Sequence, residues 1–166
     1  MNIHSYQHKK PNIDKEAKVF DGAQVIGEVS LGKNVGVWFN AVLRADMDKI
    51  VVGENTNIQD GTIIHTDENQ PTIIGKNVTI GHKALIHAAT IEDGALIGMG
   101  SIILNGAIVE KEALVGAGAV VPPGKIIKAK TLVFGNPAKE IKTLSEKDIE
   151  NIKNNTDHYV KLLKSY

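Results

Sequence analysis

Three of the six histidines lie close together near the middle of this 166-residue chain. They are His65, His82 and His87, and they fall within a stretch of regularly spaced aliphatic residues. Three neutral imidazoles can bind a divalent metal such as zinc and leave one coordination position open for water. The chain has no cysteine, which excludes disulfides, cysteine-based zinc sites and thiol nucleophiles. Whether the three histidines can meet depends on the elements that carry them.

Aliphatic residues recur every six positions over most of the chain, with slips of three residues after Leu43, four after Ile64 and minus one after Ile86. A small or β-branched residue sits four places after most of them. The recurring residues, called anchors below, are Ile13, Val19, Val25, Leu31, Val37, Leu43, Val52, Ile58, Ile64, Ile74, Ile80, Ile86, Ile91, Ile97, Ile103, Val109, Val115, Val121, Ile127 and Val133. A period of six indicates a hexapeptide repeat, in which each unit forms a short strand and a turn.

Three such units complete one triangular coil, with the anchors inside and neighbouring strands about 4.8 Å apart. The repeat therefore predicts an all-β fold, a parallel β-helix, over residues 1–138. Residues 139–166 form a second segment. Ser145 and Asp148 predict a capped helix start, and apolar residues spaced by three and four predict a helix over 146–164 that packs on the same domain.

The repeat also places the histidines, because 18 residues plus any insertion return the chain to the same side of the coil. Leu43, Ile64 and Ile86 are related in this way, so Arg44, His65 and His87 are expected to stack in one outward column. The same arithmetic stacks Asp60 with His82 on the preceding side, with Gln59 beside them.

Imidazoles on neighbouring coils can converge on one metal ion. His82 points elsewhere in its own chain, and a threefold homotrimer would bring it to the histidine column of a neighbouring subunit. That arrangement would also set Arg44 of one subunit near Asp60 of the next, as a charge-assisted pair.

The motifs Arg44-Ala-Asp46, Asn57-Ile-Gln59-Asp60-Gly61, His65, Gly81-His82 and His87 resemble those of the γ-class carbonic anhydrase family over roughly residues 11–140. The resemblance implies a left-handed β-helix and a homotrimer with metal sites between subunits. It implies His65, His82 and His87 as metal ligands. It also implies that Arg44, Asp46 and Asp60 support the interface, while Asn57 and Gln59 lie near the metal-bound solvent.

The implied activity is the reversible hydration of CO₂ to bicarbonate by a metal-bound hydroxide. Zinc is the expected metal, with iron or cobalt as alternatives. Gln59 is expected to orient the hydroxide or the substrate. Trp38, Phe39 and Met99 could form an apolar wall for CO₂ or pack at the interface. Met47 occupies a position where active relatives carry a proton-shuttling acid, so Asp67 or Glu68 would have to serve and turnover could be low.

Two other functions fit the repeat. One is a hexapeptide acyltransferase using a CoA-type donor, with a histidine as general base, although the insertions are short and no basic cluster marks a nucleotide site. The other is a metal-binding trimer without turnover.

The 19 basic and 19 acidic residues balance and give no electrostatic case for nucleic-acid or membrane partners. No apolar run approaches the length of a membrane span, and the start of the chain lacks the apolar segment of a signal peptide. A cytoplasmic location is therefore expected.

Overall fold

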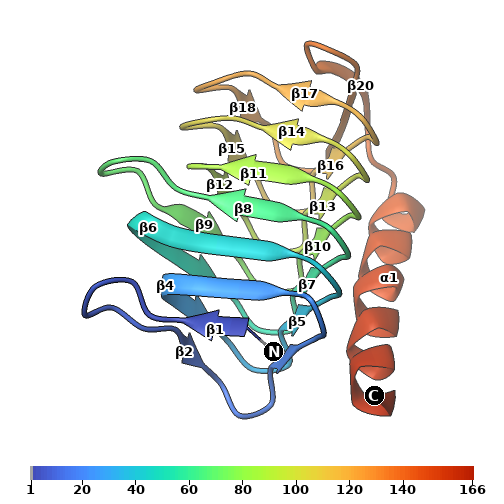
Figure 1. Cartoon of the computed structure of the whole chain (residues 1–166). Helices are drawn as coiled ribbons and strands as arrows, with labels where there is room; N and C mark the ends of the chain where they lie inside the picture. Colours follow the sequence, from blue (N-terminus) through green and yellow to red (C-terminus); the bar gives the residue numbers. More distant parts are fainter. Residues whose placement is uncertain (1) are drawn as a thin grey trace.

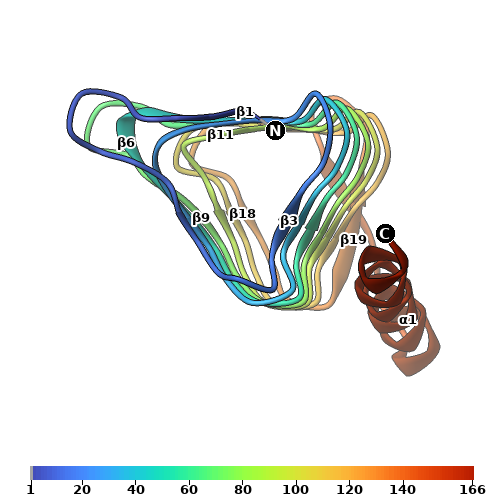
Figure 2. The ribbon, with the colours of Figure 1, turned by 60° about the horizontal axis from the view of Figure 1, so that its bottom comes forward.

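The anchors point into the centre of a three-sided parallel β-helix in the computed structural model, which describes residues 2–166 (Figure 1). Figure 2, a view along the coil, shows its triangular cross-section. The anchors from Val25 to Val133 are buried, and Ile13 and Val19 are partly buried at the open end. The predicted all-β hexapeptide fold is confirmed, with about seven turns.

Strands of successive coils pair in parallel along each side of the triangle, and a 12-stranded sheet covers two sides while an 8-stranded sheet covers the other. The side that carries the histidine column, called the histidine face, consists of β1 (Asn2–His4), the first half of β4 (Gln24–Leu31), the first half of β6 (Val42–Val52), β8 (Ile63–His65), β11 (Leu85–His87), β14 (Ile102–Ile103) and β17 (Val120–Val121). The next side, called the third face, consists of β2 (Asn12–Ile13), the second halves of β4 and β6, β9 (Thr72–Ile74), β12 (Thr90–Ile91), β15 (Ile108–Val109) and β18 (Ile126–Ile127).

The remaining side, called the helix face, consists of β3 (Lys18–Val19), β5 (Gly36–Val37), β7 (Asn57–Ile58), β10 (Thr79–Ile80), β13 (Leu96–Ile97), β16 (Leu114–Val115), β19 (Thr131–Phe134) and β20 (Lys139–Thr143). Strand β20 pairs antiparallel with β19. The repeat pattern predicted neither β20 nor β1, because both lie outside the run of anchors.

Two corners of the coil depend on residues that accept a positive φ. Gly27 bends β4 between two faces with φ +79°, and a Cβ there would lie 2.2 Å from the carbonyl oxygen of Ala45. At another corner Asn34, Asn55 and Asn77 all have positive φ. Their side chains form a ladder, in which Asn34 donates to Asn55 at 2.9 Å and Asn55 donates to Asn77 at 3.1 Å. Asparagine suits these positions because its short polar side chain tolerates the left-handed region.

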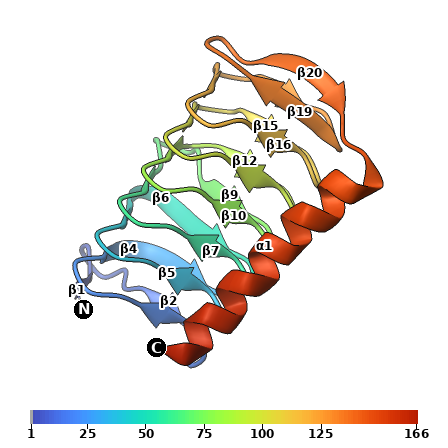
Figure 3. The ribbon, with the colours of Figure 1, turned by 90° about the vertical axis from the view of Figure 1, so that its right-hand side faces the viewer.

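Helix α1 (Glu146–Ser165) runs along the helix face, where it contacts β5 and β7 (Figure 3). The Ser145 side chain accepts from the backbone of Asp148 and the Asp148 carboxylate accepts from the backbone of Ser145, so the predicted N-terminal cap is confirmed. Ile152, Thr156 and Leu163 are buried against the coil. Helix α1, the only helix within residues 2–166, lacks the apolar run that crossing a membrane requires.

Candidate metal site

Arg44, His65 and His87 lie in one column on the histidine face. Arg44 pairs in register with His65 across β6 and β8, and His65 pairs with His87 across β8 and β11. This placement confirms the spacing argument. The rings of His65 and His87 meet edge to face, and His65 Nδ1 lies 3.1 Å from His87 Nε2.

The other ring nitrogen of each of these histidines is hydrogen-bonded to a polar side chain. His65 Nε2 lies 2.9 Å from Asp46 Oδ1. His87 Nδ1 lies 2.8 Å from Asn105 Oδ1, and Asn105 Nδ2 donates to Asp67 Oδ2 at 2.7 Å. Because a carboxylate only accepts, the Asn105 amide nitrogen must face Asp67 and its oxygen must face His87.

These partners determine where the ring protons lie. His65 donates from Nε2 to Asp46, and His87 donates from Nδ1 to Asn105. In the neutral rings the remaining nitrogens, His65 Nδ1 and His87 Nε2, therefore carry lone pairs that face each other at 3.1 Å. Two facing lone pairs repel unless a cation lies between them. Nitrogens bound to one tetrahedral zinc lie about 3.3 Å apart, given bonds of about 2.0–2.1 Å, so this pair fits a shared metal ion.

Asp46 connects this pair to Arg44, at the end of the column nearest the N-terminus, because its carboxylate also binds the Arg44 guanidinium. Burial alone would raise the pKa of the Asp46 carboxyl, but the hydrogen bonds from His65 and Arg44 outweigh it and hold that pKa below its usual value. Asp46 therefore stays ionised at neutral pH and holds the Nε2 proton of His65. Within one chain Arg44 pairs with Asp46, and its predicted pairing with Asp60 of a neighbouring subunit stays a prediction.

His82 lies apart from this pair, in the turn that follows β10 at the corner of the helix face. Its Nδ1 atom lies 2.8 Å from Asp60 Oδ2, so Nε2 is left with a lone pair. No three His, Cys, Asp or Glu side chains are grouped so that they could hold a metal ion within residues 2–166 of one chain. The chain thus presents a pair of histidines on one face and a single histidine at another corner, each with one nitrogen held by an acceptor, which is the usual environment of metal-ligating histidine.

Gln59 and Asn57 are buried beside His82. Gln59 Oε1 accepts from the backbone N–H of His82 at 3.2 Å, and Gln59 Nε2 donates to Asn57 Oδ1 at 3.1 Å. A cavity of about 360 Å³ opens here between the helix face and α1. It is lined by Gln59, Thr79, Gly81, His82, Leu96, Ile97, Gly98, Met99, Leu114, Val115, Gly116, Ala117, Asn155 and Tyr159.

The apolar residues proposed near the site separate in the structure. Met99 is exposed and lines the cavity beside His82. Trp38 instead packs under the C-terminal half of α1, stacked on Phe20 at 4.5 Å and edge-on to Tyr159 at 5.5 Å. Trp38 and Phe39 do not line the cavity beside His82 within one chain, and their place in an apolar wall or at the interface between subunits stays a prediction. The Trp38 side chain packs against helix α1 instead.

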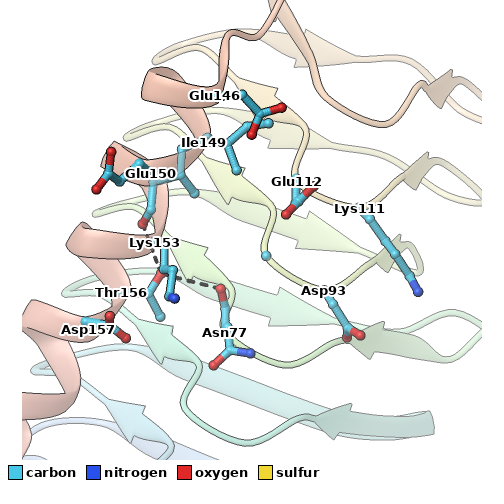
Figure 4. Close-up of a pocket in the computed structure, with 12 residues that line it drawn as sticks. Asn77, Asp93, Lys111, Glu112, Glu146, Ile149, Glu150, Lys153, Thr156 and Asp157 are labelled. Atoms are coloured by element: carbon cyan, nitrogen blue, oxygen red, sulfur yellow. Dashed lines mark hydrogen bonds between the residues drawn. The ribbon is translucent and has the colours of Figure 1, made fainter.

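A larger groove of about 530 Å³ lies between the N-terminal half of α1 and the corner that carries the asparagine ladder (Figure 4). Its rims carry carboxylates from both sides, including Glu112 and Glu150, together with Lys111 and Lys153. None of the proposed site residues lines it. It is therefore separate from the histidine sites.

Comparisons with known proteins identify the family of the chain. A model of the hexapeptide repeat of succinyl-transferase matches residues 71–104 and 88–123. A Methanocaldococcus jannaschii protein named probable carbonic anhydrase is 50% identical over 157 residues, which cover 93% of this chain and 99% of the relative. Gamma carbonic anhydrase 2, mitochondrial, of Arabidopsis thaliana is 42% identical over 160 residues, which cover 93% of this chain and 58% of that protein. The chain belongs to the γ-class carbonic anhydrase family.

The fold of this family member also matches a solved structure with a different description. The crystal structure of a hexapeptide transferase family protein from Anaplasma phagocytophilum is 40% identical, with a TM-score of 0.96 over 99% of this chain and 98% of that chain. Overall shape therefore does not separate carbonic anhydrases from transferases, and the side chains of the site must do so.

The sequence pattern missed several residues that surround the histidines of this family member. Asn105 contacts His87 from the next coil, but it lies two residues after its anchor Ile103, whereas His87 lies one residue after Ile86. Extending the column arithmetic by one more turn gives Leu104 and would not have found Asn105. Thr79, Asn155 and Tyr159 line the cavity beside His82. The repeat could not predict Asn155 and Tyr159 as lining residues, because they lie on α1, outside the repeat. Burial, reinforced by the negative charge of Asp60, raises the pKa of the Tyr159 phenol above its usual value, so the phenol stays protonated at neutral pH.

Proposed function

We propose that this chain is a metal-dependent γ-class carbonic anhydrase that interconverts CO₂ and bicarbonate. His65 and His87 of one subunit and His82 of another hold the metal. The observation that carries the proposal is the 3.1 Å separation of His65 Nδ1 and His87 Nε2, in two rings whose other nitrogens are already hydrogen-bonded. A cation bound between the two nitrogens would remove their repulsion.

Zinc is the proposed metal, with iron or cobalt as alternatives, because all three accept histidine ligands. A divalent ion held by three neutral imidazoles lowers the pKa of bound water to about 7 and so supplies a nucleophile at neutral pH. The chain's own residues prepare the ligands. Asp46, Asn105 and Asp60 each accept a hydrogen bond from one nitrogen of a histidine ring and leave its other nitrogen free to bind metal.

Gln59 and Asn57 supply hydrogen bonds beside His82. The Gln59 carboxamide uses its oxygen on the His82 backbone and one of its two N–H groups on Asn57. One N–H of Gln59 remains for a bound oxygen atom of water, CO₂ or bicarbonate. The apolar walls of the cavity, Leu96 and Leu114 among them, suit an uncharged substrate.

A homotrimer is the proposed assembly, since the site needs histidines that one chain keeps apart. A cyclic trimer sets one patch of a subunit against a different patch of its neighbour. The histidine face offers an outward apolar column beside the histidines, formed by Val42, Ile63, Leu85, Ile102 and Val120 in register. Ile63 is 47% exposed in one chain, and burying this column against a neighbour would favour assembly.

Proton transfer to solvent is expected to limit turnover. Met47, the residue after Asp46, cannot carry a proton, and the Asp67 carboxylate is engaged by Asn105. Glu68 is exposed beside Asp67 and is the remaining acidic candidate in this loop.

An acyltransferase is the second candidate, favoured by one observation. His82 with Asp60 on Nδ1 has the geometry of a histidine oriented to act as a general base. A non-catalytic metal-binding trimer would keep the metal without turnover. Stopped-flow CO₂ hydration with the metal-loaded protein tests the proposal, with the His82→Ala protein as control. Measurable hydration that His82→Ala abolishes supports it. Acyl transfer from acetyl-CoA without any dependence on metal would favour the acyltransferase instead.

A further inference from the structure

A chain of four hydrogen bonds joins the backbone of His82 to helix α1. The backbone N–H of His82 donates to Gln59 Oε1 at 3.2 Å, and Gln59 Nε2 donates to Asn57 Oδ1 at 3.1 Å. Asn57 Nδ2 donates to Thr79 Oγ1 at 2.9 Å, and Thr79 Oγ1 donates to Asn155 Oδ1 at 3.2 Å. Thr79 is on β10 and Asn155 is on α1, so the chain crosses from the coil to the helix.

The donors in this chain all run in one direction. A carboxamide oxygen only accepts and its nitrogen only donates, whereas a hydroxyl has one proton to give. Whether Thr79 donates to Asn155 Oδ1 or to the Thr156 hydroxyl, which also lies 3.2 Å away, its oxygen accepts from Asn57 Nδ2. That contact determines which way the Asn57 amide faces, and the Asn57 oxygen in turn determines how the Gln59 amide faces.

Burial makes this orientation costly to reverse. Asn57 and Thr79 are each 3% exposed and Gln59 is 4% exposed, so water has little room to replace a lost partner. A flipped Asn57 amide would place its oxygen against the Thr79 oxygen and its nitrogen against the Gln59 nitrogen. Each clash would leave a buried polar group unpaired, which destabilises far more than loss of an exposed hydrogen bond.

We propose that Thr79 is a positioning residue for the reaction, acting through Asn57 to hold the Gln59 carboxamide with its oxygen on His82 and its free N–H toward the cavity. Helix α1 contributes to this positioning, because Asn155 Oδ1 accepts a hydrogen bond from Thr79. The proposal rests on the function proposed above, in which Gln59 hydrogen-bonds the substrate or solvent. It assigns a role in the site to residues outside the motifs of the metal column.

Thr79→Val removes the hydroxyl and keeps the shape, whereas Thr79→Ser keeps the hydroxyl. With the hydroxyl gone, Asn57 Nδ2 keeps only its long 3.5 Å contact with the carbonyl oxygen of Val78, and Gln59 samples more than one orientation. We expect kcat/KM for CO₂ hydration to fall about three- to tenfold in Thr79→Val, the effect of one lost hydrogen bond, with unchanged metal content and near-normal rates in Thr79→Ser. Because Thr79 is buried, Asn155→Ala provides a second variant, which removes one acceptor of the Thr79 hydroxyl from an exposed position and leaves the Thr156 hydroxyl as the other.

The decisive readout is the side-chain amide resonances of Gln59 and Asn57 in ¹⁵N-labelled, metal-loaded protein, which report orientation whether or not the protein is active. Resonances of both that move in Thr79→Val and Asn155→Ala, and return in Thr79→Ser, support the proposal. A Gln59 resonance that stays in place in folded Thr79→Val overturns it. An unchanged kcat/KM in an active Thr79→Val protein overturns the role in the reaction. If the unsubstituted protein hydrates no CO₂, the proposed function fails, and the resonances alone still decide whether Thr79 orients Gln59.

Discussion

The Nδ1 atom of His65 lies 3.1 Å from the Nε2 atom of His87, on strands one coil apart, and other side chains already bind the second nitrogen of each ring. In two neutral rings arranged in this way, the lone pairs of the facing nitrogens repel one another. The coil therefore holds the two histidines in a geometry that a bound cation stabilises.

Asp46 is expected to strengthen metal binding through His65. In Asp46→Asn the carboxylate that accepts the Nε2 proton of His65 is lost, so the ring is less well oriented and less basic. We expect metal affinity to fall about 10–100-fold, measured by competition with a chromophoric chelator. Asp48→Asn is the matched control, because the Asp48 carboxylate accepts from the backbone of Lys49 and contacts no histidine. Equal affinities in both variants would contradict the role of Asp46.

Ile63 is expected to hold the trimer together. Ile63→Glu places a charge in the outward apolar column of the histidine face, and burying that charge at an interface is unfavourable. Sedimentation at micromolar concentration should show monomers for this variant and trimers for the unsubstituted protein. Ile126→Glu on the third face is the control, since Ile126 is similarly exposed at 53%. A trimeric Ile63→Glu protein would place the interface elsewhere.

Ile103 is expected to be important for the stability of the coil. Its side chain is fully buried and lies in register between Ile86 and Val121. Ile103→Ala should lower the free energy of unfolding by about 2–5 kcal/mol, through lost burial and the cavity left behind. Ile141→Ala in β20, where the side chain is 59% exposed, should change it by less than about 0.5 kcal/mol. Urea denaturation measures both values, and similar losses would show that the anchors do not form the core.

The cap of helix α1 is expected to make stability depend on pH in acid. The hydrogen bond from Lys142, followed by those from the backbone and hydroxyl of Ser145, lowers the pKa of Asp148 to about 2. A carboxyl whose pKa falls on folding stabilises the folded state above its unfolded pKa, and this contribution is lost as pH falls through the folded pKa. Asp148→Asn should thus be less stable than the unsubstituted protein at pH 5, and the difference should shrink as pH falls to about 2, the folded pKa. A stability difference that is the same at both pH values would rule out the ionised cap.

The sequence predicted the histidine column because the repeat converts spacing into position. Once Leu43, Ile64 and Ile86 stack, the residues after them must stack as well, and the register of Arg44, His65 and His87 confirms this. The burial of the anchors can be predicted from the local repeat alone, since each anchor packs on those of the coil before and after it.

The remaining parts of the site depend on contacts that the repeat does not specify. Asp67 reaches Asn105 from a loop inserted between β8 and β9, and loop conformation has no period. Asn155 and Tyr159 reach the cavity only because α1 docks on the helix face in one particular position. That position depends on packing around Trp38 and Thr156, which spacing along the helix cannot reveal.

Metal shared between subunits is the central claim, and mixed trimers test it most directly. His82→Ala and His87→Ala proteins each lack one ligand at every site, so neither should bind metal alone. Co-expressed in equal amounts with different tags, and checked for mixed trimers by native mass spectrometry, they should form intact sites wherever His82 of one variant meets His65 and His87 of the other. Random assembly in a cyclic trimer predicts about one quarter of the metal content of the unsubstituted protein, measured by elemental analysis. Mixed trimers that hold no metal, or a single variant that holds a full complement, would contradict a site built between chains.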